Sequence, residues 1–257
     1  MNVRPLPHEL ADVRRIEAVS FRSFPSASTH YDGTWAIRLT AGHPAKRLNS
    51  VTPLDPNDHS DLERRVELAQ LRFEGFGRPL VFRLSPLAPP ELDALLESRG
   101  WDRFQESLVM AKPLDREALA QAVDHLPLKD MGRWVDASLA LANADGDRKP
   151  GMVEVLSAIE AETGLFLSED AEGRPLSAVR CVCENDLAGI FELETNGARR
   201  REGHGRAILA SALKWAAARR AQTAWLQVEA ANAAALSLYR EFGFVELYRY
   251  VYRQAPA

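Results

Sequence analysis

The segment Arg199–Leu209, RRREGHGRAIL, says most about the fold of this 257-residue chain. Three arginines and two glycines stand directly before a segment with helical periodicity. The first turn of a helix leaves backbone N–H groups unpaired and carries a partial positive charge, so it suits an anion. Gly203 and Gly205 lack a Cβ atom and let a large anion approach these donors. The segment is therefore either a basic turn before a helix or a phosphate-binding loop, and the rest of the chain must decide between them.

The glycine spacing excludes two common phosphate-binding motifs. A P-loop requires Gly, four residues and then Gly-Lys-Ser/Thr, and this sequence contains no such run. A dinucleotide-binding fingerprint requires a third glycine at position 208, where Ile208 stands. The pattern that remains is Arg200-x-x-Gly203-x-Gly205.

Alternating and helical patterns around this loop predict a sheet with helices packed on it. Apolar residues from Ile208 to Ala216 recur at helical spacing, and Asn232 is a plausible N-cap for a second helix. The predicted elements are two strands on either side of a turn at 171–175, a third strand at 187–195, the helix after the loop, a strand at 223–230, a helix at 233–242 that ends at Gly243, and a final strand at 244–253. The order β-β-β-α-β-α-β indicates an α/β layer.

A second segment, residues 232–244 with the sequence NAAALSLYREFGF, follows the loop. Together the two segments resemble the GNAT superfamily of acetyl-CoA-dependent N-acetyltransferases. The loop is similar to the pyrophosphate loop of that superfamily, and the second segment matches its pattern Asn-x-x-Ala-x-x-Leu-Tyr-x-x-x-Gly-Phe at Asn232, Ala235, Leu238, Tyr239, Gly243 and Phe244. The motifs cover about a quarter of the chain, and Gly197 stands where the superfamily often has proline.

The resemblance implies a binding site for acetyl-CoA. Backbone N–H groups of residues 201–206 would bind the pyrophosphate. The pantetheine arm would lie between the strand ending at Thr195 and the strand 223–230. Backbone donors near Leu193 to Thr195 would polarise the thioester carbonyl. The implied cofactor-binding residues are Leu193, Glu194, Thr195, Arg200, Arg201, Glu202, Gly203, His204, Gly205, Arg206, Asn232, Ala235 and Tyr239.

The resemblance also implies catalytic roles. Tyr239 would be the general acid that protonates the leaving thiolate. A general base must deprotonate the amine, and the candidates are Glu192, then Glu194, with Glu229 on the neighbouring strand as a third. Alternation places both Glu192 and Glu194 on one face of the strand 187–195, opposite Phe191, Leu193 and Thr195.

Simpler interpretations of these residues stay open. Tyr239 can be a packed helix aromatic, Asn232 a helix cap, and the glutamates solvated carboxylates. His204 is more typical of a solvent-facing loop residue than of a base. No metal site is predicted, because Cys181 and Cys183 alternate on one strand and no further ligand cluster accompanies them.

The first 112 residues resemble a second, weaker copy. Residues 92–111 and 234–253 both show a helix, a glycine with an aromatic residue after it, and a strand. Residues 32–51 resemble a segment of two-domain superfamily members at Trp35, Arg38, Arg47, Asn49 and Ser50. We therefore expect an α/β (α+β) protein with tandem GNAT-like folds, a degenerate domain at 1–113 and a catalytic domain at 114–257. The first domain would line the acceptor pocket or only cover the sheet edge.

The middle of the chain is predicted to be helical. Residues 116–125 and 131–142 have helical patterns, and residues 143–151 are a polar loop. The segment is expected to form a lid or a helix pair that precedes the sheet.

Composition narrows the class of protein. A net charge of −4 argues against a general nucleic-acid binder. No apolar run approaches the ~20 residues of a membrane span, and residues 1–10 do not resemble a secretion signal. We expect a cytoplasmic protein with no membrane partner.

The predicted function is transfer of an acetyl group from acetyl-CoA to a primary amine of a small molecule, peptide or protein, by direct attack in a ternary complex. A non-catalytic acyl-CoA-binding or regulatory module is the alternative. The sequence predicts neither the acceptor nor the oligomeric state.

Overall fold

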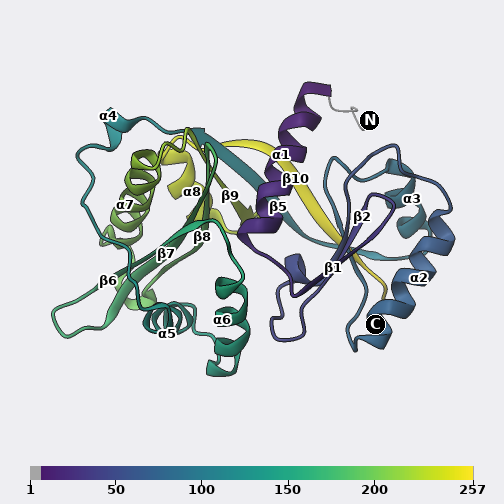
Figure 1. Ribbon diagram of the computed structural model, residues 1–257, viewed down its shortest axis with the longest axis horizontal. Coiled ribbons are helices and arrows are strands. Elements are labelled where there is room, and N and C mark those ends of the chain that lie inside the picture. The colour runs from purple at the N-terminus through teal and green to yellow at the C-terminus, as the bar shows by residue number, and fades with distance from the viewer. Residues whose placement is uncertain (1–6, 257) are drawn as a thin grey trace.

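The computed structural model describes residues 7–256, in which helices and strands alternate along the chain (Figure 1). The helices are α1 Pro7–Ser23, α2 Leu62–Gly75, α3 Pro90–Ser98, α4 Arg116–Leu119, α5 Met131–Leu141, α6 Lys149–Ser157, α7 His204–Ala218 and α8 Ala233–Glu241, with short 3-10 turns η1 Lys46–Leu48, η2 Gly146–Arg148 and η3 Gly197–Arg199. The strands are β1 Ser28–Asp32, β2 Trp35–Leu39, β3 Ser50–Pro53, β4 Val81–Leu84, β5 Asp102–Pro113, β6 Glu162–Glu169, β7 Pro175–Glu184, β8 Leu187–Thr195, β9 Thr223–Glu229 and β10 Val245–Gln254.

One sheet runs through both halves of the molecule, with the strand order β1-β2-β3-β4-β10-β5-β9-β8-β7-β6. Its pairs are antiparallel except β3 with β4 and β8 with β9, which are parallel. The last strands of the two halves are exchanged, since β5 pairs with β9 and β10 pairs with β4. Figure 1 shows β5 and β10 running side by side from one half to the other. The predicted boundary at residue 113 falls at the end of β5, in the middle of this shared sheet.

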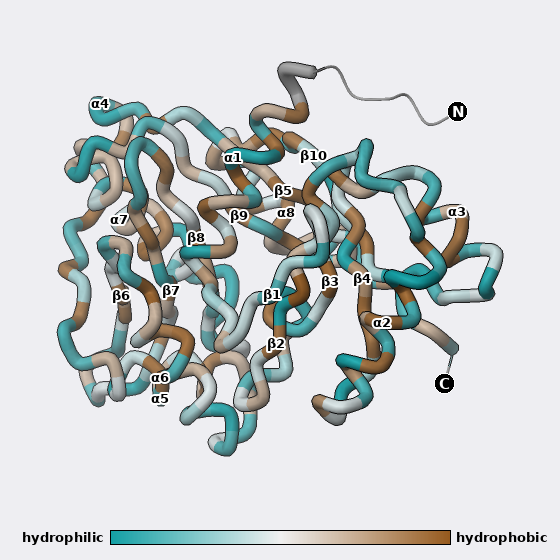
Figure 2. Tube along the Cα trace, turned by 45° about the vertical axis from the view of Figure 1, so that its right-hand side comes forward, coloured by the Kyte–Doolittle hydropathy of each residue, from teal (hydrophilic) through white to brown (hydrophobic). Residues whose placement is uncertain are grey.

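Helices cover both faces of the sheet. On one face of the second half, α7 and α8 pack over a core that includes Leu209 and Leu236. On the other face lie α1, which contributes Ile16, and the pair α5 and α6. Figure 2 shows hydrophobic residues concentrated on the strands and inner helix faces, with mostly hydrophilic loops at the periphery. Because apolar side chains are buried on both faces of the sheet, the strands appear in the sequence as apolar segments.

The repeated unit predicted from the sequence is present. Helix α3 is followed by Gly100 at φ +73° and the buried Trp101, and α8 by Gly243 at φ +83° and the buried Phe244. Both glycines hold a left-handed conformation that ends the helix, which explains their place in the repeat. A strand, β5 or β10, follows in each case.

Several local predictions need correction. The strand β1 was not expected, although it pairs with β2 over its whole length. Helix α4 covers only Arg116–Leu119, since Val123 and Leu126 after it are exposed and offer no apolar face to bury. Helix α6 begins inside the predicted loop 143–151, because Pro150 fits the first turn of a helix. The predicted helix at 131–142 is confirmed as α5, but its partner before the sheet is α6 and not the predicted helix at 116–125.

Candidate active site

Strands β8 and β9 diverge, and this divergence creates the centre of the site. Their last parallel pair is Ile190 with Leu226. Beyond it β8 stays paired with β7 as far as Thr195, while β9 stays paired with β5 as far as Glu229. The backbone of β8 after Ile190 therefore has no strand partner on its β9 side. This opening lies where the sequence predicts a gap for a cofactor arm.

A β-bulge lies in β8 at the start of this gap. The register with β7 shifts between Ala178 and Arg180, and Glu192 has a φ of +48°. The extra residue changes the predicted alternation, because a bulge places two residues against one. Phe191 packs with Trp225 on the α1 face, whereas Leu193 packs on the opposite face below α7. The prediction that Phe191 and Leu193 share a face is wrong.

The loop between β8 and α7 leaves backbone donors available. Arg201 has a φ of +67° and Gly203 a φ of +86°, so both adopt the left-handed region, and no side chain caps the N-terminus of α7. A Cβ atom at Gly205 would lie 2.8 Å from Oγ1 of Thr195. Glycine at 205 thus lets the first turn of α7 approach the end of β8, next to the gap.

Some arginines of this loop are paired with carboxylates, and others are not. Glu202 binds Arg199 through contacts of 2.8 Å and lies 3.2 Å from Nε2 of His204. Arg206 forms an ion pair with Glu241 of α8. Within residues 7–256 neither Arg200 nor Arg201 has an ion-pair partner. These two cations are therefore free to bind an anion at the start of α7.

Tyr239 lies on the α7 face of the gap. Its ring is 7% exposed and contacts the ring of Phe244 at 5.8 Å between centroids. Burial raises the pKa of Tyr239 to about 12, and the negative charge of Glu194 adds to this effect. The hydroxyl therefore stays protonated at neutral pH, as a proton donor must.

Glu194 and Glu192 have opposite electrostatic environments. Burial raises the pKa of Glu194, the charge of Glu192 raises it further, and Arg200 opposes both. Burial would also raise the pKa of Glu192, but the charge and hydrogen bonds of Arg180 hold it below its ordinary value. Arg180 donates from Nε and Nη2 to the Glu192 carboxylate at 2.6 and 3.0 Å. Glu194 is the carboxylate whose proton affinity is increased.

Arg180 is a site residue that sequence reasoning missed. Its side chain is completely buried, its Nη1 donates to the Ser23 carbonyl at the end of α1, and its guanidinium lies 4.3 Å from the centre of the Phe191 ring. The available signal was an arginine within the apolar segment AVRCVC. A charge at such a position requires a buried partner.

Asn232 caps the N-terminus of α8, which was one of the two interpretations of this residue. Its side-chain oxygen accepts a hydrogen bond from the backbone N–H of Ala235 at 3.1 Å. Cys181 and Cys183 are both buried and form no disulfide.

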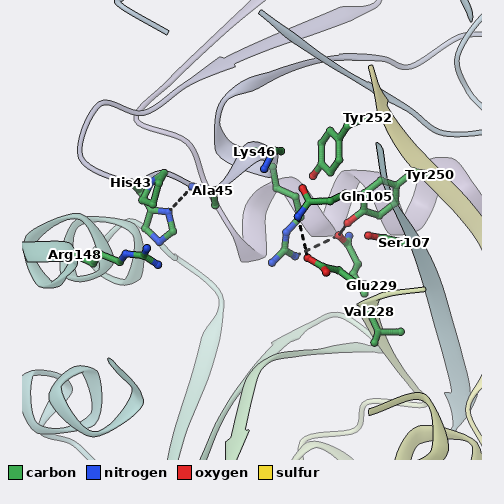
Figure 3. A pocket seen from close by; sticks show the side chains of 13 residues that line it. His43, Ala45, Lys46, Gln105, Ser107, Arg148, Val228, Glu229, Tyr250 and Tyr252 are labelled. Atoms are coloured by element: carbon green, nitrogen blue, oxygen red, sulfur yellow. Dashed lines mark hydrogen bonds between the residues drawn. The ribbon is translucent and has the colours of Figure 1, made fainter. Parts of the chain in front are cut away.

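A cavity of about 500 Å³ lies beside the gap, on the face opposite α7 (Figure 3). Figure 3 shows His43 and Arg148 on one side and Glu229, Tyr250 and Tyr252 on the other. Glu229 accepts a hydrogen bond from Gln105 at 3.3 Å and so belongs to the cavity wall. Residues 43–47 of the first half also line it.

Arg47 connects the cavity to the gap. It donates to Oε1 of Gln227 on the diverging end of β9 at 3.3 Å, and its guanidinium lies 6.0 Å from the centre of the Phe191 ring on β8. Arg38 donates to the Arg47 carbonyl at 2.8 Å, and Asn49 donates to the carbonyls of His43 and Ala45. Arg38 and Asn49, two of the five residues singled out in the segment 32–51, thus hold the cavity wall in place. Trp35 and Ser50 are buried in the first half.

Comparison with known proteins identifies the family. A family model described as "Probable histone acetyltransferase Rv0428c C-terminal" matches residues 10–253. The chain belongs to this family. It is similar to an uncharacterized N-acetyltransferase of Bacillus subtilis, YobR, with 25% identity over 94% of this chain and 98% of the relative.

Solved structures share the fold. A GCN5-related N-acetyltransferase from Kribbella flavida superposes with a TM-score of 0.66 at 18% identity, covering 95% of both chains. A tandem GNAT protein from the clavulanic acid biosynthesis pathway superposes with a TM-score of 0.63 at 13% identity, covering 100% of this chain and 90% of its own. The predicted fold class is confirmed.

These findings establish the class of enzyme. The protein is an acyltransferase of the GNAT type, an N-acetyltransferase whose acceptor is an amine. Proteins of this type generally use acetyl-CoA. Among residues 7–256, none of the helices has the length and hydropathy of a membrane-spanning segment.

Proposed function

We propose that the second half of the chain binds acetyl-CoA between β8 and β9, and that Glu194 and Tyr239 carry the proton transfers of amine acetylation. The observation that carries this proposal is the divergence of β8 from β9 directly beside the uncapped start of α7. Open strand backbone, free helix donors and two arginines without an ion-pair partner thus lie together at the end of β8.

The loop fits a diphosphate. Backbone N–H groups of residues 201–206 at the start of α7 would hold it, and Arg200 and Arg201 would add charge-assisted hydrogen bonds. The absence of a Cβ at Gly205 keeps these donors close to Thr195 and hence to the gap. Asn232 and Ala235 of α8 would border the cofactor arm. The bound molecule supplies the acetyl thioester.

Glu194 is better suited than Glu192 to accept a proton from the amine. The amine must be neutral before it attacks, and a base works best when its pKa is close to the working pH. The pKa of Glu194 is shifted in this direction, whereas Glu192 is held in its ion pair with Arg180. Glu192 would instead fix the bulge that aims the backbone of β8, including the donors near Leu193 to Thr195, into the gap.

Tyr239 would return a proton to the departing thiolate. Its raised pKa keeps the hydroxyl protonated, and it reaches the gap from the α8 side. Glu194 and the cavity lie toward the other face, so acid and base approach from opposite sides. This separation suits direct attack in a ternary complex, in which the amine and the thiolate occupy opposite ends of the reacting group.

We also propose that residues 1–113 are a copy that binds no cofactor and residues 114–257 the catalytic unit. The first half supplies residues 43–47 to the cavity, which supports a role as a wall of the acceptor site.

The test compares two adjacent arginines. Arg200→Gln should weaken CoA binding about tenfold, since it removes a charge-assisted contact with phosphate. Arg199→Gln is the matched control, because Arg199 is already paired with Glu202. Calorimetry gives the CoA affinity, and thiol release with a panel of amines gives turnover. Equal affinity in both variants, or CoA binding with no turnover of any amine, would overturn the proposal.

A further inference from the structure

The cavity beside the gap is a built site with walls from five parts of the chain, one of which is Gln105 and Ser107 of β5. Segment 43–47 forms one wall, Arg148 at the start of α6 a second, the end of β9 a third, and Tyr250 and Tyr252 of β10 a fourth. Gly151 fixes the first two walls against each other, since a Cβ atom there would lie 1.8 Å from the Gly42 carbonyl oxygen. The backbones of α6 and of the segment before η1 are therefore in direct contact.

Positive charge predominates among the side chains of this cavity. Lys46, Arg47 and Arg148 all line it, and Glu229 is the only carboxylate among its lining residues in the described chain. Glu229 is partly engaged by the amide of Gln105. Neither Lys46 nor Arg148 has an ion-pair partner within residues 7–256. Figure 3 shows Arg148 facing the cavity from the side of His43.

Neutral donors accompany these cations. His43 accepts a hydrogen bond at Nδ1 from the N–H of Ala45 at 3.2 Å, which leaves Nε2–H as a donor. Burial, together with the charges of Arg47 and Arg148, lowers the pKa of His43 against the opposing effect of Glu192. The ring is therefore neutral at pH 7. The charges of Glu192 and Arg148 both act on the pKa of His43. His43 therefore lies between the bulge in β8 and the cavity.

The cavity and the gap share the end of β9. Its floor includes Gln227 to Glu229, which are the residues of β9 beyond its last pair with β8. Arg47 spans the space between Gln227 and Phe191, and Glu192 and Glu194 follow directly on β8. A molecule in the cavity can thus extend from Lys46 or Arg148 to the end of β9 that borders the gap.

We propose that the acceptor is a small primary amine with an anionic group, a carboxylate or a phosphate, at its other end, and that Lys46 and Arg148 bind this group. The inference rests on the proposed function, because it assumes that the amine is acetylated at the gap. The protein's overall negative charge would favour a cationic acceptor, but the local charge of the cavity decides recognition at short range.

The experiment uses amines of similar length that differ in the distal group. These are 3-aminopropionate, phosphoethanolamine, neutral ethanolamine and cationic 1,3-diaminopropane, together with a lysine-rich peptide. Binding to the protein–CoA complex is measured by calorimetry, and kcat/KM by thiol release. One or both anionic amines should exceed ethanolamine by about tenfold or more, with the dication weakest. The ratio of the first two probes distinguishes a carboxylate from a phosphate.

Variants link the preference to the cavity. Arg148→Gln and Lys46→Gln should each raise KM or Kd for the anionic amine about tenfold and leave both ethanolamine and CoA unaffected. Lys149→Gln is the matched control, since Lys149 pairs with Asp136 and does not line the cavity.

The outcomes separate this inference from the proposed function. Thiol release with the dication or the peptide in preference to the anions would overturn the inference and leave the proposed function intact. Tight binding of an anionic amine that Arg148→Gln abolishes, without thiol release, would support the cavity assignment and contradict the proposed catalytic roles. Equal binding of all four amines, or no binding of any, would overturn the inference.

Discussion

The two halves of the chain share a plan but differ in one loop. Each half connects a strand to a helix that lacks a side-chain cap at its N-terminus, from β3 to α2 and from β8 to α7. In the second half this connection carries Arg200 and Arg201, and in the first half it carries Asp55, Asp58 and Asp61. Hydrogen bonds from Arg65 and Thr34 outweigh burial and lower the pKa of Asp58 to about 2. Asp58 therefore stays ionised in its ion pair with Arg65, and a connection that carries three aspartates does not suit a phosphate.

The end of the repeated unit differs as well. Tyr239 stands four residues before Gly243, and the fully buried Leu96 stands four residues before Gly100. The first half has therefore kept the packing of the unit and has no proton donor at the corresponding position. Fold alone does not determine function, and here a few side chains make the difference between the halves.

The largest effect should follow from removing the Tyr239 hydroxyl, which the first half lacks at the corresponding position. Tyr239→Phe removes the proposed proton donor and keeps the ring packed against Phe244. We expect kcat to fall about 10³-fold while CoA affinity changes less than about twofold. Thiol-release kinetics and calorimetry measure the two quantities. Unchanged turnover would show that another group protonates the thiolate.

A second substitution tests how firmly the halves are joined. Glu17 of α1 binds Arg83 of β4 at 2.6 and 2.9 Å, and accepts from the Tyr248 hydroxyl of β10 at 2.7 Å. Glu17→Gln should lower the free energy of unfolding by about 3 kcal/mol, because Arg83 stays buried without its counter-charge.

Urea denaturation should then show one transition for both halves, since β5 and β10 are exchanged between them. Arg174→Ala, which removes an exposed ion pair with Asp170, is the control and should cost less than about 1 kcal/mol. Two separate transitions in the native protein would contradict the shared sheet.

A third test concerns the close approach of α7 to the end of β8 at Gly205. Gly205→Ala should weaken CoA binding about tenfold, because its Cβ would press on Oγ1 of Thr195 and move the start of α7 away from β8. The double variant Gly205→Ala, Thr195→Ala removes the clash and should restore affinity. Failure of the rescue would mean that the glycine acts through backbone flexibility instead.

The smallest effect is a shift in pH dependence. Glu194 must be deprotonated to act as a base, so kcat/KM should rise with pH through its raised pKa and then reach a plateau. Tyr239, with a pKa of about 12, should keep this plateau flat through the neutral range. Glu194→Gln should remove the rise. An acid limb at the ordinary pKa of a glutamate would instead favour a solvated carboxylate.

Sequence patterns predicted the second half well, because its motifs are local. The loop at 199–209 and the helix before Gly243 each depend on residues close together in the chain. The bulge at Glu192 and the partners of Arg180 could not be predicted, since they depend on pairing with β7 and on contact with Ser23 of α1. The exchange of β5 and β10 was hidden for the same reason, because a local pattern predicts a strand but not its partner.

Local sequence patterns also could not predict what the first half contributes to the site. Lys46 and Arg148 lie a hundred residues apart and line one cavity, which the packing of Gly151 against Gly42 helps to form. The sequence identified Arg47 and Asn49 through a resemblance, but the cavity that they shape is a tertiary feature.

The stoichiometry of CoA binding tests the central claim most directly. Calorimetry of the intact chain should give one CoA per chain, with affinity that falls in Arg200→Gln and is unchanged in Asp58→Asn. Two CoA molecules per chain, or one whose affinity responds to Asp58 and not to Arg200, would contradict the assignment of the cofactor to the second half.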